Sequence, residues 1–399
     1  MLGVGAGPAD AGATAAAQPR VSGVPDAEER AAWIALAAVP GVGQAGFARL
    51  LQRYGSARAV LERSPVEVVT HVPRADGSTR LALERLQQVG ARRSADELEH
   101  AAARAGAAAI TSRDGAYPAR LAALPIQPPV LYVAGDPAGL SEPCVAVVGT
   151  RHPTGYGRAA AAEIADELAR AGVCVISGLA LGIDGIAHRA AIAAGGRTAA
   201  VLPSPVDRVY PPRHRELASA MVAAGGAVVA ETPPGRMTGK PDFARRNRIV
   251  SGLADAVVVV EAPDHSGALL TASSAVDQGR DLFAVPGPID SAASRGCNRL
   301  IADHQAEIVT SPVALVQRIG LRPAGRLPLA VGLSESEGLV LGSLLQCSGS
   351  IEELMARTQL ATSALASALT LLEARGLVTS YGGATFHPTL AARQNEIGR

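Results

Sequence analysis

The sequence contains few aromatic residues and almost no lysine. Aromatic residues make up 3% of its 399 positions, including four phenylalanines and one tryptophan. Of the 37 basic residues, all except Lys240 are arginines. Because arginine has replaced lysine nearly everywhere, the position that keeps lysine is a candidate for a site that needs a compact point charge instead of a planar fork.

Cysteines and long apolar runs are also scarce. The four cysteines are far apart and form no CxxC pair, which argues against a zinc site and a disulfide framework and favours the reducing cytoplasm. We find no run of about 18 apolar residues and no basic secretory leader, so we expect no membrane span and no secretory signal. The formal net charge is only +1, so any affinity for nucleic acid must come from a local patch.

The distribution of apolar and polar segments predicts several domains. A length of 399 residues with 48% hydrophobic residues and 43 glycines is typical of a globular α/β protein with more than one core. We expect a disordered tail over 1–27, a helical domain over 28–108, a Rossmann-like domain over 109–320, a linker over 321–332 and a winged helix over 333–390.

The N-terminal helical domain contains a segment, 39–51, that resembles a helix-hairpin-helix (SAM-like) motif. Its Gly-x-Gly turn would let backbone N–H groups approach a phosphate at a helix N-terminus. A plain turn between two helices needs glycine for the same positive φ angles. We therefore expect the shape of a helix-hairpin-helix here, but we favour a plain turn that binds no phosphate.

Short apolar runs within 109–320 predict a parallel sheet. They are mostly rich in β-branched residues and are continuous rather than alternating, as strands buried on both faces are. The predicted strands cover 145–148, 173–176, 198–202, 228–230, 256–260 and 282–285. Helical stretches such as 158–171 separate them, which indicates an α/β fold with an extended Rossmann-like, doubly wound sheet.

The C-terminal part of the chain predicts three helices and a β-hairpin, which together make a winged helix. The helices are expected over 334–346, 350–358 and 362–375, and a hairpin with a Gly-Gly turn over 376–386. The start of the third helix, Thr362–Ala368, carries no cation to meet a phosphate. We therefore expect this domain to pack against protein, and we disfavour a transcriptional regulator that reads DNA with it.

Three glycine-rich turns that follow predicted strands are candidates for binding an anion. They cover 149–157, 177–188 and 261–272. Ligands of doubly wound sheets lie beyond the carboxyl ends of the strands, where glycine lets backbone amides and helix N-termini approach negative charge. We predict one phosphate-binding rim with countercharge from Arg151 and the cluster 240–248. Taken singly, each turn is better explained as an ordinary strand-to-helix turn.

The segment 239–253 places Lys240 and Phe243 next to an Arg-Arg-Asn-Arg run. Several cations around one ring are typical of a groove that follows a nucleic-acid strand, with charge for the phosphates and a ring for a base. A solvated helix start explains the same residues equally well.

The motifs do not support most catalytic and cofactor sites. No GxGxxG follows the first predicted strand and no Walker A motif is present, so we expect no NAD, FAD or ATP and no other cofactor. Asp184 and His188 are spaced like metal ligands on a helix, but a third ligand is not evident. We therefore expect them to support the residues of a site from behind or to cap a helix. Together with Ser177 they make a triad on paper, which no Gly-x-Ser-x-Gly elbow supports.

The order of the motifs resembles that of the bacterial DNA-processing protein A (DprA, or Smf) family. The similar segments are 117–118, 131–135, 148–157, 177–188, 206–211, 231–235, 240–248, 266–272 and 279–287. The resemblance is dense over about 110–310 and holds by shape on either side. Two departures lower the expected charge of the pocket: Leu181 stands where a basic residue is common, and Pro203-Ser204-Pro205 replaces a glycine-rich turn.

The resemblance implies a cytoplasmic, non-catalytic protein that binds and protects single-stranded DNA and loads RecA in natural transformation or other DNA processing. It also implies a homodimer through the Rossmann-like domain. Contacts to the strand carry over to the phosphate-binding positions and a stacking position, with further members of the same motifs. These residues are Thr150, Arg151, Ser177, Gly178, Lys240, Asn247, Ser266 and Gly267, the stacking Phe243, and Arg246, Arg248 and Thr271. Within the Arg-Arg-Asn-Arg run we favour Asn247 as the strand contact, and the alternative for Arg246 and Arg248 is that they brace the pocket or the helix start.

An enzyme is the alternative interpretation. The predicted sheet also resembles that of nucleotide phosphoribohydrolases, which cleave a glycosidic bond with the glutamate of a P-G-G-x-G-T-x-x-E turn. The equivalent turn here, 266–274, lacks that glutamate. The sequence therefore disfavours the enzyme.

Overall fold

The computed structural model describes residues 26–73, 75–141, 143–320, 333–375, 377–381 and 385–388. The expected tail, up to residue 25, and the expected linker, 321–332, lie outside them. The chain divides into two compact units. One runs to Glu97 and includes Ile110–Val130, and the other comprises Leu98–Ala109 and the chain from Leu131 onward. Within the described ranges, we find no helix with the length and apolar character that a bilayer crossing needs.

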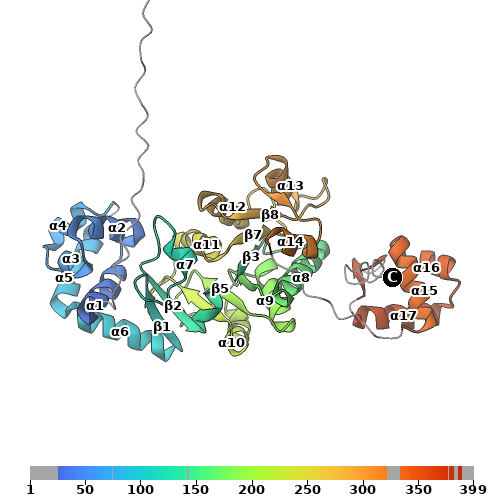
Figure 1. The fold of residues 1–399 in the computed structure, drawn as a ribbon, viewed down its shortest axis with the longest axis horizontal. Coiled ribbons are helices and arrows are strands. Elements are labelled where there is room, and N and C mark those ends of the chain that lie inside the picture. The colour runs from blue at the N-terminus through green and yellow to red at the C-terminus, as the bar shows by residue number, and fades with distance from the viewer. Residues whose placement is uncertain are drawn as a thin grey trace, which may run out of the picture. The chain divides into compact units, whose positions relative to one another are not determined.

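The N-terminal unit consists of short helices, as predicted (Figure 1). They are α1 (Ala27–Ala37), α2 (Gly43–Tyr54), α3 (Ala57–Leu61), α4 (Pro65–Thr70), α5 (Gly77–Val89) and α7 (Ala119–Ala122), and α6 (Ala91–Arg104) leads out of the unit. Several begin at a side chain that accepts a backbone N–H, as Ser56, Ser64 and Asp76 do. Trp33 and Phe47 meet edge-on in the core, with ring centroids 4.9 Å apart.

The segment 110–130 packs with these helices, which differs from the single boundary expected at 108–109. Trp33 Nε1 donates a hydrogen bond of 2.9 Å to the carbonyl oxygen of Pro129. The guanidinium of Arg113 lies 5.4 Å from the centroid of the Trp33 ring. These contacts join residues far apart in the chain, and sequence periodicity does not reveal such contacts.

Among the described residues, nine strands form one large sheet (Figure 1). They are β1 (Ala107–Thr111), β2 (Val130–Gly135), β3 (Cys144–Val148), β4 (Cys174–Ser177), β5 (Thr198–Leu202), β6 (Ala227–Ala230), β7 (Ala256–Val259), β8 (Asp281–Ala284) and β9 (Glu307–Ile308). Their order is β1-β2-β6-β5-β4-β3-β7-β8-β9. Strands β3 to β9 are parallel, whereas β2 pairs antiparallel with β6. All six predicted strands are present, and the reversal of order between β3 and β7 confirms the doubly wound sheet.

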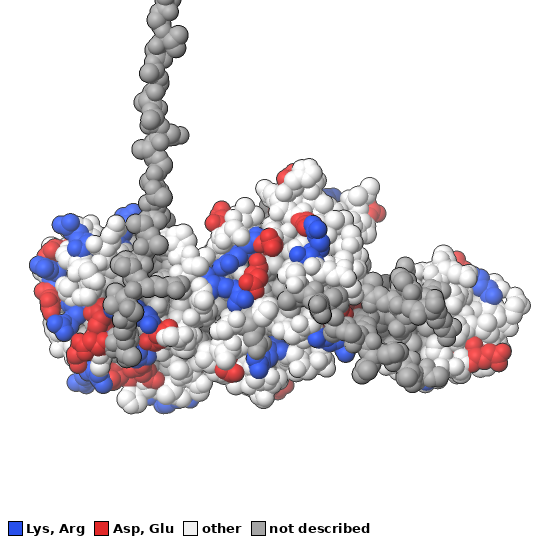
Figure 2. Space-filling model, in the orientation of Figure 1, with Lys and Arg blue, Asp and Glu red and all other residues white. Residues whose placement is uncertain are grey.

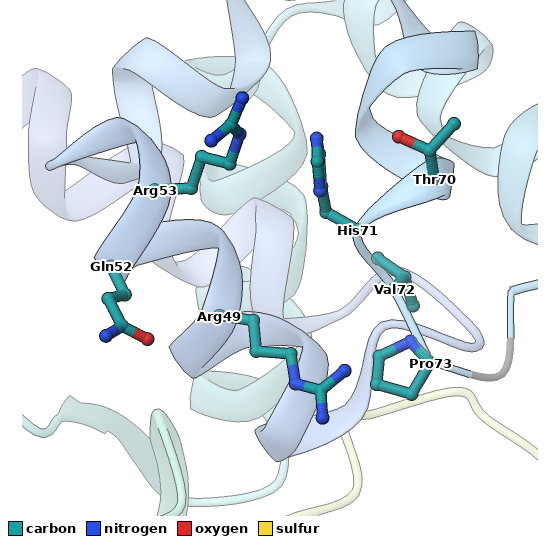
Figure 3. A pocket seen from close by; sticks show the side chains of 7 residues that line it. All are labelled: Arg49, Gln52, Arg53, Thr70, His71, Val72 and Pro73. Carbon is teal, nitrogen blue, oxygen red and sulfur yellow. The ribbon is translucent and has the colours of Figure 1, made fainter.

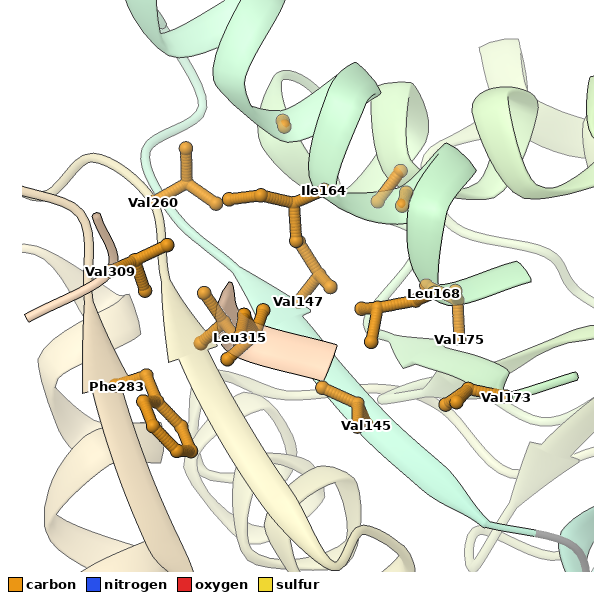
Figure 4. Close-up of a cluster of buried hydrophobic side chains, with 14 of the residues drawn as sticks. Val145, Val147, Ile164, Leu168, Val173, Val175, Val260, Phe283, Val309 and Leu315 are labelled. Carbon is orange, nitrogen blue, oxygen red and sulfur yellow. The ribbon is translucent and has the colours of Figure 1, made fainter. Parts of the chain in front are cut away.

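Helices cover both faces of this sheet. On one face, α8 (Gly155–Arg170), α9 (Ile183–Ala193) and α14 (Pro312–Arg318) bury an apolar core with Val145 and Val147 of β3 (Figure 4). Right-handed crossovers place the helices of the two half-sheets on opposite faces. Accordingly α11 (Lys240–Leu253) contacts β3, β4 and β5, and α12 (Gly267–Asp277) contacts β7 and β8. Short helices complete the unit: α10 (Arg215–Ala223), α13 (Arg295–Ala302), η1 (Pro137–Ser141) and η2 (Pro212–His214).

The C-terminal part contains the helices and the hairpin strands that the sequence predicts, in the predicted order. They are α15 (Glu335–Gln346), β10 (Gly349–Ser350), α16 (Ile351–Thr358), α17 (Thr362–Ala374), β11 (Val378–Tyr381) and β12 (Thr385–Pro388). The strands pair antiparallel in the order β10-β12-β11, and the Gly-Gly turn lies outside the described residues. A local core includes Leu344, Leu354 and Leu369. Its assignment as a winged helix stays a prediction.

Candidate nucleic-acid interface

The three glycine-rich turns lie at one edge of the sheet, as predicted. They follow β4, β3 and β7, which are direct neighbours and run parallel. The strand order reverses at this point, and the crevice beyond the carboxyl ends of the strands is where doubly wound sheets bind ligands. The topology of the sheet therefore predicts a ligand site at this edge.

A buried glutamate at the end of β7 fixes the turn after β3. The carbonyl oxygen of Glu261 accepts the N–H of Thr150 at 2.7 Å. Its carboxylate accepts both the N–H of Thr154 at 2.8 Å and the hydroxyl of Thr154 at 2.7 Å. Glu261 thus holds both ends of the turn that carries Arg151. In the sequence Glu261 stands at the start of a glycine-rich turn and is not a predicted site residue, although a carboxylate directly after a buried strand is a signal for such a role.

Asp184 fixes the turn after β4. Its buried carboxylate accepts the N–H groups of Gly178 at 3.1 Å and Ala180 at 3.2 Å, which confirms the expected supporting role. Burial raises the pKa of Asp184, and the nearby Arg246 and these N–H groups oppose that rise. Gly182 has φ of 82°, and a Cβ there would lie 2.4 Å from the carbonyl oxygen of Thr150, so this turn requires glycine.

Arg246 braces the same turn from the core side. Its guanidinium donates to the carbonyl oxygens of Gly178 and, at 2.6 Å, Val201, and only 7% of the residue is exposed. Burial lowers the pKa of Arg246, while Asp184 acts in the opposite direction. A Cβ on Gly178 would lie 2.1 Å from the guanidinium, which explains the glycine by packing. In this structure Arg246 is engaged with protein, which is the bracing role that the sequence left open beside a strand contact.

Three further residues expected at the strand have side chains that are buried or paired. The hydroxyl of Ser177 is fully buried and donates to the carbonyl oxygen of Val147 at 2.6 Å. Thr271 is 3% exposed within α12. Arg248 forms an ion pair of 2.8 Å with Glu231. These side chains support the fold, and a contact of these residues with a strand stays a prediction.

The arrangement of His188 argues against the triad drawn on paper. His188 Nδ1 lies 2.6 Å from Thr198 Oγ1, which itself donates to the carbonyl oxygen of Val175 at 2.6 Å. The hydroxyl proton of Thr198 is therefore used, so Nδ1 donates its proton to Thr198 Oγ1. Burial, with contributions from nearby cationic groups, lowers the pKa of His188 to about 3. The hydroxyl of Ser177 is bonded elsewhere, so the structure holds no activated serine here.

Two cations and two rings remain at the surface of this edge. Arg151 and Lys240 are exposed, and no described residue forms an ion pair with either. The guanidinium of Arg151 lies 5.8 Å from the centroid of the half-buried Phe243. The ring of Tyr210 meets Phe243 edge-on, with centroids 5.5 Å apart. We call Arg151, Tyr210, Lys240 and Phe243 the exposed rim. Tyr210 was not among the predicted contacts, although its Tyr-Pro pair was one of the motifs.

Helix geometry places Lys240 and Phe243 on the same side of α11. Lys240 is the first residue of α11, and Phe243 follows at a spacing of three, which places both on one side of the helix. Asn247 continues this side, and its Nδ2 donates to the carbonyl oxygen of Gly267 at 3.3 Å. Ser266 caps α12 by accepting the N–H of Ala268 at 3.3 Å. Asn247 thus ties α11 to the start of α12.

A shallow pocket of about 40 Å³ lies between the rim and the braced turn. Its lining residues are Arg151, Gly178, Ala180, Leu181, Pro203, Tyr210, Pro211, Phe243 and Arg246. Sites that enclose a small molecule usually measure roughly 300–1,000 Å³. This pocket therefore fits a phosphate or the edge of a base, and not a whole nucleotide.

Positive charge at this edge is confined to a local patch, as expected for a chain whose net charge is only +1. On the face shown in Figure 2, lysine and arginine side chains of the sheet unit gather over α11, with acidic side chains beside them.

In the part of the chain that the structure describes, no cluster of three His, Cys, Asp or Glu residues is arranged to hold a metal ion.

Comparisons with known proteins agree with these features. A family model described as DNA recombination-mediator protein A matches residues 108–320, and one described as a DprA-like N-terminal HHH domain matches 27–71. Protein Smf of Synechocystis sp. is 34% identical over 304 residues, which is 74% of each chain. A DNA processing protein DprA of Mycobacterium tuberculosis is 38% identical over 347 residues, 80% of this chain and 86% of that protein. The X-ray structure of DNA processing protein A from Streptococcus pneumoniae superposes with a TM-score of 0.60 at 29% identity, covering 71% of this chain and 97% of that one.

Proposed function

Because the chain belongs to the DNA-processing protein A (DprA/Smf) family, we propose that it takes part in DNA processing by binding single-stranded DNA along the exposed rim. One observation carries the proposal: the guanidinium of Arg151, which forms no ion pair with a described residue, lies beside the ring of Phe243, and the exposed Lys240 begins the same helix three residues before that ring. Cations meet phosphates and rings stack on bases, and a single strand presents both together.

The shape of the site favours a strand over a free nucleotide. The pocket of about 40 Å³ is open and holds only part of one residue of a strand. Affinity must then be collected from several weak contacts along the surface, as in grooves that follow a backbone. The turns after β3 and β4 are braced by Glu261 and Asp184, so the surface is preformed.

Glycosidic cleavage is the alternative, and the described carboxylates do not favour it. Glu261, Asp184 and Asp242 are buried, and each accepts hydrogen bonds from protein groups. None of the three lines the pocket. Incubation of the protein with AMP or CMP tests this alternative, because release of free base would replace our proposal with an enzyme.

The proposal predicts that Arg151→Ala and Lys240→Ala each weaken binding to single strands of any sequence, because the lost contacts are to the backbone. Fluorescence anisotropy at fixed salt measures the affinity. The plot of log affinity against log salt should also become shallower by about 0.7 for each phosphate contact removed. The matched control is Arg170→Ala, since Arg170 is an exposed arginine at the opposite end of α8 that pairs with Asp166. An unchanged affinity in the double variant contradicts the proposal.

We further propose that the protein delivers the strand to RecA, acts as a homodimer through the sheet unit and works in the cytoplasm. The family resemblance supports these points. Light scattering tests the dimer by its mass. The RecA step is tested by the rate at which RecA assembles on a strand coated with single-strand-binding protein, which should rise with this protein and not with the Arg151→Ala/Lys240→Ala variant.

A further inference from the structure

The N-terminal helical unit contains an open cleft between α2 and the end of α4 (Figure 3). Its volume is about 540 Å³. The lining residues are Arg49, Gln52 and Arg53 on α2 and Thr70, His71, Val72 and Pro73 at and beyond the end of α4. Two guanidinium groups, an amide and a hydroxyl are thus presented together, and Val72 and Pro73 are the only apolar members.

The arginines of the cleft form no ion pair with a described residue, unlike most others in this unit, and Arg53 lies with its guanidinium carbon 6.0 Å from the centroid of the Tyr54 ring. Four of the other arginines form an ion pair with an acidic residue four positions further along the chain: Arg58, Arg80, Arg92 and Arg93. Ion pairs with another segment are formed by Arg30, Arg113 and also Arg58. Arg49 and Arg53 are exposed, and no described residue forms an ion pair with them. They lie four residues apart on one helix, a spacing at which like charges repel. A bound anion would remove this repulsion.

The carboxylate on the facing helix is committed elsewhere. Glu67 of α4 accepts a hydrogen bond of 2.9 Å from the hydroxyl of Tyr54. The ring of His71 packs edge-on against Tyr54, with centroids 5.9 Å apart. These contacts hold the end of α4 beside α2 and leave the two guanidinium groups on the opposite wall of the cleft.

The glycine hairpin that precedes α2 is explained without a ligand. Gly41 has φ of 87°, and a Cβ there would lie 2.0 Å from the hydroxyl oxygen of Thr79 at the start of α5. Close packing against α5 therefore requires this glycine, in agreement with the interpretation favoured from the sequence. The charge pattern of the unit points to the cleft instead of the hairpin.

We infer that this cleft is a second nucleic-acid contact, in which Arg49 and Arg53 bind phosphates of a strand. Guanidinium groups bind phosphate oxygens in forked geometry, and Gln52 and Thr70 offer hydrogen bonds to phosphate or sugar. Among the residues that line the cleft, His71 is the only aromatic one. We therefore expect the cleft to hold the sugar-phosphate backbone of the strand and not a base. The choice of a nucleic acid as the polyanion rests on the proposed function.

The test uses the full chain and compares Arg49→Gln/Arg53→Gln with Arg80→Gln/Arg92→Gln. The control removes the same charge from the same unit, but at arginines that are already paired. Fluorescence anisotropy is measured with an oligo-dT of about 8 nucleotides, within the span of one groove, and with one of about 40 nucleotides. Equal melting temperatures verify that both variants fold.

We expect the cleft variant to bind the long strand about tenfold more weakly and the short strand within about twofold of the unchanged protein. Its salt slope on the long strand should fall by about 1.4, which corresponds to two phosphates. Equal affinity of the cleft and control variants for the long strand overturns the inference. Tripolyphosphate binding that the cleft variant loses, with strand binding unchanged, overturns it too and assigns the cleft to free polyphosphate.

The two proposals fail separately. Loss of the rim contacts in Arg151→Ala/Lys240→Ala should weaken binding of the short strand, whereas the cleft variant should not. A rim variant that binds the short strand normally contradicts the proposed function and leaves the cleft result to be judged on the long strand alone.

Discussion

At the scale of single residues, arginine serves two opposite purposes in this protein. Arg246 is buried and donates to the carbonyl oxygens of Gly178 and Val201, whereas Arg151 is exposed beside Phe243. Both belong to segments that the sequence marks as basic or glycine-rich. Only the structure separates them, because the difference lies in the buried carboxylate of Asp184, which compensates Arg246 and has no counterpart for Arg151.

Asp184→Asn should destabilise the sheet unit by about 3 kcal/mol. The change keeps the size of the side chain but removes the negative charge that acts on the buried guanidinium of Arg246 and weakens the bonds that the carboxylate accepts from the N–H groups of Gly178 and Ala180, and buried bonds to a charged group are costly to lose. Thermal unfolding followed by circular dichroism measures the effect. Asp264→Asn is the control, since Asp264 pairs with Arg299 at the surface and should contribute less than about 1 kcal/mol. Similar melting temperatures for the two variants would contradict the assigned role of Asp184.

His188 should make the protein less stable in mild acid. Its pKa is about 3 in the folded chain, below its ordinary value of 6.5, so the unfolded chain binds more protons between these values. Stability is therefore complete above about pH 6.5 and falls by up to about 1.4 kcal/mol per unit as the pH drops towards 3. Urea denaturation between about pH 7 and pH 5 measures the slope. His188→Gln should flatten it, whereas the exposed His265→Gln should not.

At the scale of elements, the turn after β4 links folding to binding through Gly182. Gly182→Ala places a Cβ against the carbonyl oxygen of Thr150 and should displace the turn that carries Arg151. Gly195 is a matched control, because it also has positive φ, 75°, but has open space around its Cα. Both alanine variants should lose about 1–2 kcal/mol through the left-handed backbone. Only Gly182→Ala should also lose affinity for single strands in anisotropy measurements.

The sequence predicts the buried elements of this fold well and the surface elements poorly. The central strands, such as β7 with its run of Val257, Val258 and Val259, are continuous apolar segments, and burial on both faces leaves a clear pattern. By contrast β9 has two exposed residues and β1 is largely alanine, so neither carries a periodic signal. The adjacency of the three turns followed from the doubly wound pattern.

The candidate site was predictable by segment but not by side chain. Lys240 and Arg151 are exposed and Phe243 is half-buried in the segments that the motifs marked. Ser177 and Thr271 belong to the same motifs, yet their side chains are buried. A motif records that residues are needed together, and it does not separate those that meet a ligand from those that hold the turn.

At the scale of the whole molecule, the chain assembles separate cores with different surface chemistry. The sheet unit has its apolar core around Val147 and Ile164, and the C-terminal part has its own around Leu344 and Leu354. The described face of α17 offers no lysine or arginine along Thr362–Ala374. This part of the chain has the means to fold on its own but not to attract a phosphate backbone with that helix.

Removal of the chain beyond Gly320 should therefore leave the affinity for single strands within about twofold. The exposed rim and the N-terminal cleft are retained in such a variant, and a strand gains little from a helix without cations. Anisotropy with the long oligo-dT measures the affinity, and circular dichroism confirms folding. A loss of tenfold or more would show that the C-terminal part contacts the strand and would contradict this prediction.

The single lysine of the chain has a practical consequence. Lys240 is exposed at the start of α11 and no described residue pairs with it, so apart from the N-terminal amine it is the only primary amine that a reagent can reach. Besides the N-terminal amine, an amine-directed dye would thus label only the edge of the protein's own proposed site, without any substitution. Slower labelling in the presence of a strand would report occupancy of the rim in the unaltered protein.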